Sequence, residues 1–92
     1  MTSRDVTVVN QLGMHARAAA KFVHLAARYQ AHVRVARETR QMEGKSIMGI
    51  LLLAAARGST ITISAEGTDE HAAVDALVAL VASGFGEDVC GA

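Results

Sequence analysis

The 92-residue chain contains no proline, no tryptophan and a single cysteine, Cys90. One cysteine excludes an internal disulfide, so the fold does not rest on a disulfide framework. The longest apolar stretches, such as residues 50–56, are much shorter than the roughly twenty residues that a membrane-spanning helix requires. The chain begins with a polar segment and lacks the basic and then apolar pattern of a secretory signal. We therefore expect a cytoplasmic protein with no membrane partner.

Aromatic residues make up only 3% of the chain, and the charges cancel, because nine Lys and Arg stand against nine Asp and Glu. Both features count against a nucleic-acid-binding domain, which draws affinity from excess positive charge and from stacking on bases. This class is kept as the weaker alternative. With 51% hydrophobic residues the composition is that of a globular protein. Its length fits one domain over residues 1–92, with a core over about residues 6–87.

Alternation of apolar and polar residues with period two predicts four β-strands. They are centred on residues 6–8, 32–37, 40–43 and 59–66. In the last of them, which is the clearest, Ile61 and Ile63 share one face. A turn at residues 10–13 ends the first strand, and a tight turn at residues 38–39 joins the second and third as a hairpin.

Apolar spacings of three and four residues predict three α-helices. They cover residues 16 to about 28, residues 46–53, and a last segment that starts after Thr68 or Asp69 and ends at Ser83-Gly84. Ser46 is the expected N-cap of the second helix, and Thr68 or Asp69 is that of the third. The element order βαββαβα predicts an α+β fold in which a four-stranded antiparallel sheet carries all three helices on one face.

The first predicted helix has two different faces. Its apolar stripe consists of Ala19, Ala20, Val23, Ala26 and Ala27. Its polar row consists of Arg17, Lys21, His24 and Arg28, and it is positively charged.

Charge is distributed unevenly along the neutral chain. Every charged residue from Val6 to Arg37 is basic, and every one after Arg57 is acidic, up to Glu87 and Asp88. Such a dipole favours the docking of an acidic partner surface near the first helix. Two ordinary solvated faces are the alternative interpretation.

His15, at the start of the first helix, is the strongest candidate for chemistry. The segment Gly13-Met14-His15-Ala16-Arg17 places its imidazole where a turn becomes a helix. First-turn N–H groups and the helix dipole hold an anion at such a point, and the Arg17 guanidinium suits phosphate oxygens. The same field disfavours the protonated ring, which leaves a ring nitrogen as a nucleophile toward a phosphoryl group. A capping histidine without chemistry is the alternative.

Other familiar site patterns are absent from the sequence. No pair of histidines has metal-ligand spacing, so we expect no metal and no cofactor. Gly44-Lys45-Ser46 is similar to the end of a nucleotide-binding P-loop, but that pattern requires glycine where this chain has Thr39. ATP binding through this segment is therefore not expected.

The segment that begins at Ser46 has two open interpretations. Ser46 is either only an N-cap or also a phosphorylation switch, because a helix start tolerates an added negative charge. Ile47, Met48, Leu51 and the leucines beside them cannot all face inward on one short helix. An exposed Ile47-Met48 pair beside a basic helix would serve a transient interface, whereas core packing is the simpler account.

Five short segments of the chain together resemble one protein family. They are residues 13–17, 20–23, 45–49, 65–67 and 83–87. In this order and spacing they resemble the HPr phosphocarrier proteins of the bacterial phosphoenolpyruvate-dependent sugar phosphotransferase system, from about Val6 to Glu87. The resemblance implies an open-faced β-sandwich with the element order predicted above.

The same resemblance implies a role for each candidate. His15 would accept a phosphoryl group from phosphorylated enzyme I and pass it to a histidine of an enzyme IIA component, with the assistance of Arg17. Ser46 would be the target of an HPr kinase/phosphorylase. The residues that would dock partners are Lys21, His24, Ile47, Met48 and Leu51. The chain would be a monomeric phosphoryl carrier and not a stand-alone enzyme.

One position departs from the family pattern. Ala18 stands where family members commonly have proline, whose ring fixes φ in the first helical turn. Its effect on the transfer rate is left open by the sequence. A regulatory member of the family, acting in nitrogen or metabolic control through protein contacts, is the alternative to a sugar-transport relay.

Overall fold

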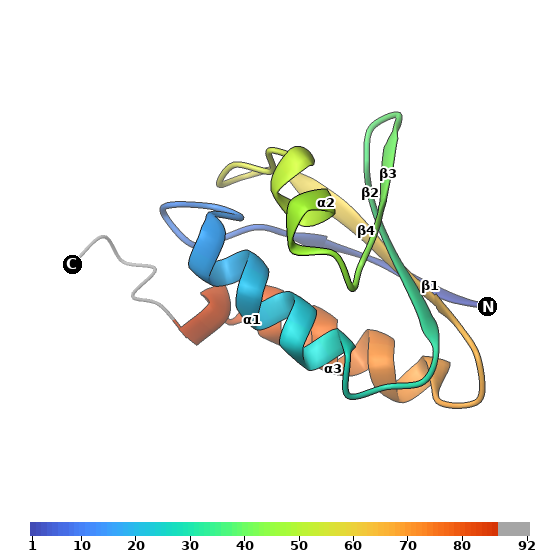
Figure 1. Cartoon of the computed structure of the whole chain (residues 1–92). Helices are drawn as coiled ribbons and strands as arrows, with labels where there is room; N and C mark the ends of the chain where they lie inside the picture. The colour runs from blue at the N-terminus through green and yellow to red at the C-terminus, as the bar shows by residue number, and fades with distance from the viewer. Residues whose placement is uncertain (87–92) are drawn as a thin grey trace.

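The computed structural model describes residues 1–86 of the chain (Figure 1). Its elements are β1 (Thr2–Thr7), α1 (Ala16–Ala26), β2 (His32–Arg37), β3 (Arg40–Glu43), α2 (Ile47–Leu52), β4 (Thr60–Glu66), α3 (Glu70–Ala82) and a 3-10 turn at Gly84–Gly86. The predicted α+β class and the order βαββαβα are therefore confirmed. Cys90 and the acidic residues Glu87 and Asp88 lie outside the described residues.

The four strands form one antiparallel sheet in the order β1-β4-β2-β3. All three helices lie on one side of this sheet and leave its other face open (Figure 1). The predicted hairpin of β2 and β3 closes at residues 38–39, where Glu38 adopts a left-handed φ of 56°. The open-faced β-sandwich that the sequence predicts is thus the observed architecture.

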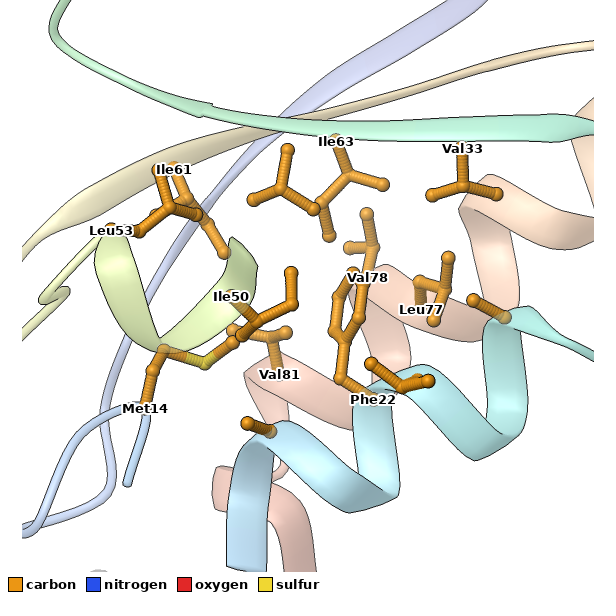
Figure 2. Close-up of a cluster of buried hydrophobic side chains, with 14 of the residues drawn as sticks. Met14, Phe22, Val33, Ile50, Leu53, Ile61, Ile63, Leu77, Val78 and Val81 are labelled. Carbon is orange, nitrogen blue, oxygen red and sulfur yellow. The ribbon is translucent and has the colours of Figure 1, made fainter. Parts of the chain in front are cut away.

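The core fills the space between the helices and the covered face of the sheet (Figure 2). Ile61 and Ile63 of β4 point into it, as their alternation predicts, and both are fully buried. From the helices, Phe22 of α1 and Leu77 of α3 meet them. Met14, just before α1, is buried in the same cluster, so the chain that leads into the helix is anchored in the core.

Strand β1 starts at Thr2, four residues earlier than the alternation around Val6 predicts. The added residues pair with β4 through their backbones, and their polar side chains bond α3. The Thr2 hydroxyl donates a 2.6 Å hydrogen bond to Glu70, and the Arg4 guanidinium pairs with Asp75 at 3.0 Å. Polar residues with such partners give no apolar period to detect.

One helix boundary and one helix cap also differ from the prediction. Helix α1 ends at Ala26 rather than near residue 28, and Ala27 is exposed, while Phe22 takes the central buried position. Asp69 occupies the N-cap position of α3 but makes no side-chain cap. Its carboxylate instead accepts hydrogen bonds of 2.8 Å from the backbone N–H groups of Gln30 and Ala31. A long-range contact has replaced the local one.

Candidate functional site

His15 is the N-cap residue of α1. Its backbone is extended, with φ −73° and ψ 178°, and its carbonyl accepts the first helical hydrogen bond, from the N–H of Ala19 at 2.8 Å. Its own N–H donates to the carbonyl of Gly13 at 2.9 Å. The side chain is half-exposed. The ring therefore stands on a fixed backbone at the helix start, where the sequence places it.

The Nδ1 atom of His15 faces the first turn of its own helix. It accepts a 3.3 Å hydrogen bond from the backbone N–H of Arg17. A ring nitrogen that accepts a hydrogen bond carries a lone pair, so a neutral ring in this geometry holds its proton on Nε2. First-turn N–H groups have no helical carbonyl partner and, with the helix dipole, attract negative charge. Nδ1 thus combines a nucleophilic lone pair with an anion-binding setting.

The turn that precedes His15 is packed against the loop between α2 and β4. The N–H of Met14 donates to the carbonyl of Ala55 at 3.0 Å. Gly13 has φ +65°, and a Cβ placed on it would lie only 2.6 Å from that carbonyl oxygen. The position therefore requires glycine on both counts. Sequence reasoning missed Ala55, because the contact uses its backbone and leaves no signal in residue type.

The basic row of α1 faces solvent. Arg17, Lys21, His24 and Arg28 are all exposed. The Lys21 ammonium also donates a 2.7 Å hydrogen bond to the carbonyl of Phe85, so it ties α1 to the 3-10 turn that follows α3. The row begins at the His15 end of the helix and continues along its exposed side.

Helix α2 exposes the apolar side chains of its first turn. Ile47 is 40% exposed and Met48 67% exposed. Leu51 is half-buried against the core, and Leu52 is 53% exposed. The prediction that some apolar surface of this helix remains open is therefore confirmed, but Leu52, not singled out from the sequence, contributes more of it than Leu51.

Ser46 caps this short helix as predicted. Its hydroxyl oxygen accepts a 3.1 Å hydrogen bond from the N–H of Gly49. At the other end, the guanidinium groups of Arg40 and Arg37 donate to the carbonyls of Leu52 and Leu53, at 2.8 and 3.1 Å. The β2–β3 hairpin therefore supplies the cations that complement the helix C-terminus.

Among residues 1–86, no group of three or more His, Cys, Asp or Glu side chains is placed to hold a metal ion. No helix in the same range has the length and apolar character needed to cross a membrane.

His15 thus begins a helix whose exposed side is basic, and α2, which contacts this helix, exposes apolar side chains. Fold and site thus define a small α+β protein with a half-exposed histidine at a helix N-terminus. The model of one family, described as the PTS HPr component phosphorylation site, matches residues 2–83. The chain belongs to this family, the HPr phosphocarriers of the sugar phosphotransferase system.

Relatives and solved structures agree with this family membership. The chain is 51% identical over 87 residues to the phosphocarrier protein HPr of Cupriavidus necator, with 95% of this chain and 98% of the relative covered. It is 46% identical to the HPr of Pseudomonas aeruginosa, with the same coverage. The crystal structure of HPr-C-His from Thermoanaerobacter tengcongensis matches 96% of this chain and 99% of its own with a TM-score of 0.92 at 40% identity. The chain is therefore a phosphocarrier, and its relatives favour this function over the regulatory alternative.

Proposed function

We propose that Nδ1 of His15 accepts the phosphoryl group from phosphorylated enzyme I and passes it to a histidine of an enzyme IIA component. The observation that carries the proposal is the hydrogen bond from the Arg17 N–H to Nδ1. It directs the lone pair at the helix N-terminus, where three phosphoryl oxygens would meet backbone N–H donors and the helix dipole.

The transfer exchanges one nitrogen–phosphorus bond for another. As the His15 lone pair forms its bond to phosphorus, the bond to the donor nitrogen breaks and its electron pair stays on the donor ring. The second transfer reverses these roles, with His15 as the leaving group. Little covalent chemistry is left for the protein, so positioning and charge stabilisation supply the rate. For this reason we propose a carrier that works only with its partners and is not a stand-alone catalyst.

The surface around His15 would align those partners. In the proposal, the Arg17 guanidinium assists at the phosphoryl oxygens. The docking residues are Lys21, His24, Ile47, Met48 and Leu51, to which the exposure of Leu52 adds a sixth. A basic row next to an apolar patch suits a partner with an acidic rim and an apolar centre. We propose a monomeric carrier in the cytoplasm.

Incubation with enzyme I and phosphoenolpyruvate tests the proposal. We expect one acid-labile phosphoryl group per chain, found on His15 by mass spectrometry and lost in His15→Ala. His71→Ala, which changes an exposed histidine on α3, is the control that keeps full labelling. His24→Ala is expected to slow labelling without abolishing it. Labelling that persists in His15→Ala would reject the proposal.

We also propose that Ser46 is a regulatory phosphorylation site for an HPr kinase/phosphorylase. Its hydroxyl lies at the N-terminus of α2, beside the exposed Ile47 and Met48. A dianionic group there would change the charge that the docking surface presents to an acidic partner. Incubation with such a kinase and ATP should add an acid-stable phosphate that Ser46→Ala lacks. An unchanged yield in that variant would refute this role.

A further inference from the structure

Asn10 is the one polar residue of the described range that is fully buried. It lies five residues before His15, at the start of the turn that leads into α1. Its side-chain NH2 group donates a 2.8 Å hydrogen bond to the carbonyl of Gly13. Its backbone carbonyl accepts a hydrogen bond from the Gly13 N–H at 3.1 Å. Asn10 therefore closes this turn with both its side chain and its backbone.

The peptide unit between Gly13 and Met14 is held at both ends. Its oxygen accepts hydrogen bonds from the Asn10 amide and from the His15 N–H, at 2.8 and 2.9 Å. Its N–H, which belongs to Met14, donates to the Ala55 carbonyl at 3.0 Å. Because a peptide unit is planar, fixing its oxygen and its N–H fixes the orientation of the whole unit. This unit directly precedes the residue whose ring faces the helix N-terminus.

This peptide unit needs hydrogen bonds to fix its orientation, because it follows a glycine. Gly13, at φ +65°, is the residue of the turn with the widest choice of backbone conformations. Without the Asn10 amide, only the His15 N–H and the Ala55 carbonyl would hold the peptide unit. A rotation there would move the His15 backbone and change the 3.3 Å approach of Nδ1 to the Arg17 N–H.

We propose that Asn10 is a positioning residue for phosphoryl transfer, which sets the orientation of the His15 ring through the Gly13 carbonyl. The proposal rests on the function proposed for His15. A displacement of about 1 Å in a reacting group lowers a rate by up to about a hundredfold. Loss of the Asn10 amide should therefore slow the transfer step itself and leave the docking surface unchanged.

The test is single-turnover transfer from phosphorylated enzyme I to Asn10→Leu, which keeps the branched shape and the number of side-chain heavy atoms and removes the amide. We expect the rate at saturating donor to fall about tenfold or more, with the half-saturating concentration within about twofold of the parent. The NMR signals of the His15 ring and of the Arg17 amide should shift. Val74→Ala, which opens the core in α3, is the control: it should lower stability and keep the transfer rate.

Transfer by Asn10→Leu within about twofold of the parent rate, with unmoved His15 signals, would overturn the proposal. So would an equal loss of rate in Val74→Ala. If Asn10→Leu does not fold, Asn10→Ser, whose hydroxyl is too short to replace the amide, is judged by the same two results. His15→Ala, run in parallel, separates the two failures: labelling in that variant rejects the site itself, whereas a normal rate in the Asn10 variants rejects only the role of Asn10.

Discussion

Gly13 shows how one small residue fixes the geometry before His15. Its backbone has a left-handed φ of +65°, which favours glycine. In addition, a Cβ at this position would lie only 2.6 Å from the Ala55 carbonyl oxygen. Gly58 makes a useful comparison, because it also has a positive φ, +90°, but a Cβ there would meet nothing within 4 Å. A side chain at Gly58 would therefore strain only the backbone, whereas a side chain at Gly13 would also collide with the Ala55 carbonyl.

We predict that Gly58→Ala lowers the free energy of unfolding by about 1 kcal/mol, which is the cost of a left-handed backbone alone. Gly13→Ala should cost at least about 2 kcal/mol, because the Ala55 carbonyl must also move. Urea denaturation of both variants measures the difference. Equal losses would show that the loop after α2 yields easily and that Gly13 does not hold it in place.

At this scale, residue type predicts part of the local geometry. The positions of His15 and Ser46 at helix starts are confirmed, because their side chains suit an N-cap, whereas the roles of His15, Arg17 and Ser46 stay predictions. Asn10 was assigned only to a turn, although asparagine in turns commonly uses its amide to bond nearby backbone. The carbonyl of Ala55 gave no signal, since every residue has one.

Helix α2 depends on its ends more than on its interior. It has six residues, one of them Gly49, and isolated helices of this length are not stable in water. Ser46 caps one end, while Arg37 and Arg40 complement the other. Gly49 allows close packing, because a Cβ there would lie 3.3 Å from that of Met42 on β3. The glycine that weakens the helical pattern in the sequence thus seats the helix on the hairpin.

We predict that Ser46→Ala lowers the free energy of unfolding by about 1 kcal/mol, the usual cost of losing an N-cap, and speeds amide exchange in α2. The matched control is Ser83→Ala, whose exposed hydroxyl donates to the Leu80 carbonyl and caps no N–H group. It should change stability by less than about 0.5 kcal/mol. If both substitutions have the same effect, the Ser46 cap does not stabilise α2.

Elements with an uninterrupted apolar period were predicted well. The expected strand at 59–66 differs from β4 by one residue, because its inward residues form a regular alternation. Strand β1 was shortened in the prediction, since Thr2 and Arg4 are held by partners about seventy residues away in the sequence. The N-cap position of Asp69 is confirmed, but its side chain bonds a distant loop instead of the first turn of α3, for the same reason. Contacts of this kind follow from the tertiary fold alone.

Across the whole molecule, acidic groups join the last helix to the rest of the fold. The Thr2 hydroxyl, and after it the N-terminal ammonium, lower the pKa of Glu70 from 4.5 to about 2. The backbone N–H of Gln30, with that of Ala31, lowers the pKa of Asp69. A carboxyl group whose pKa is lower in the folded state stabilises the fold above its unfolded pKa. That contribution is lost as the pH falls through the folded value.

We therefore predict that stability decreases on acidification between pH 4.5 and about 2, the window that Glu70 defines. Glu70→Gln should be less stable than the parent at neutral pH and should show a flatter loss in this window. Glu66→Gln is the control, because it removes an exposed charge that is not one of the groups around Glu70. Denaturation midpoints recorded from neutral pH downward measure both effects; identical acid slopes in the parent and Glu70→Gln would contradict the assignment.

The most direct measurement of the central claim is phosphorus–nitrogen coupling in the phosphorylated chain. A sample with ¹⁵N-labelled histidine, charged by enzyme I and phosphoenolpyruvate, should show one phosphorus signal coupled to Nδ1 of His15. That result places the phosphoryl group at the nitrogen that faces the Arg17 N–H. Coupling to Nε2, or to the ring of another histidine, would contradict the account.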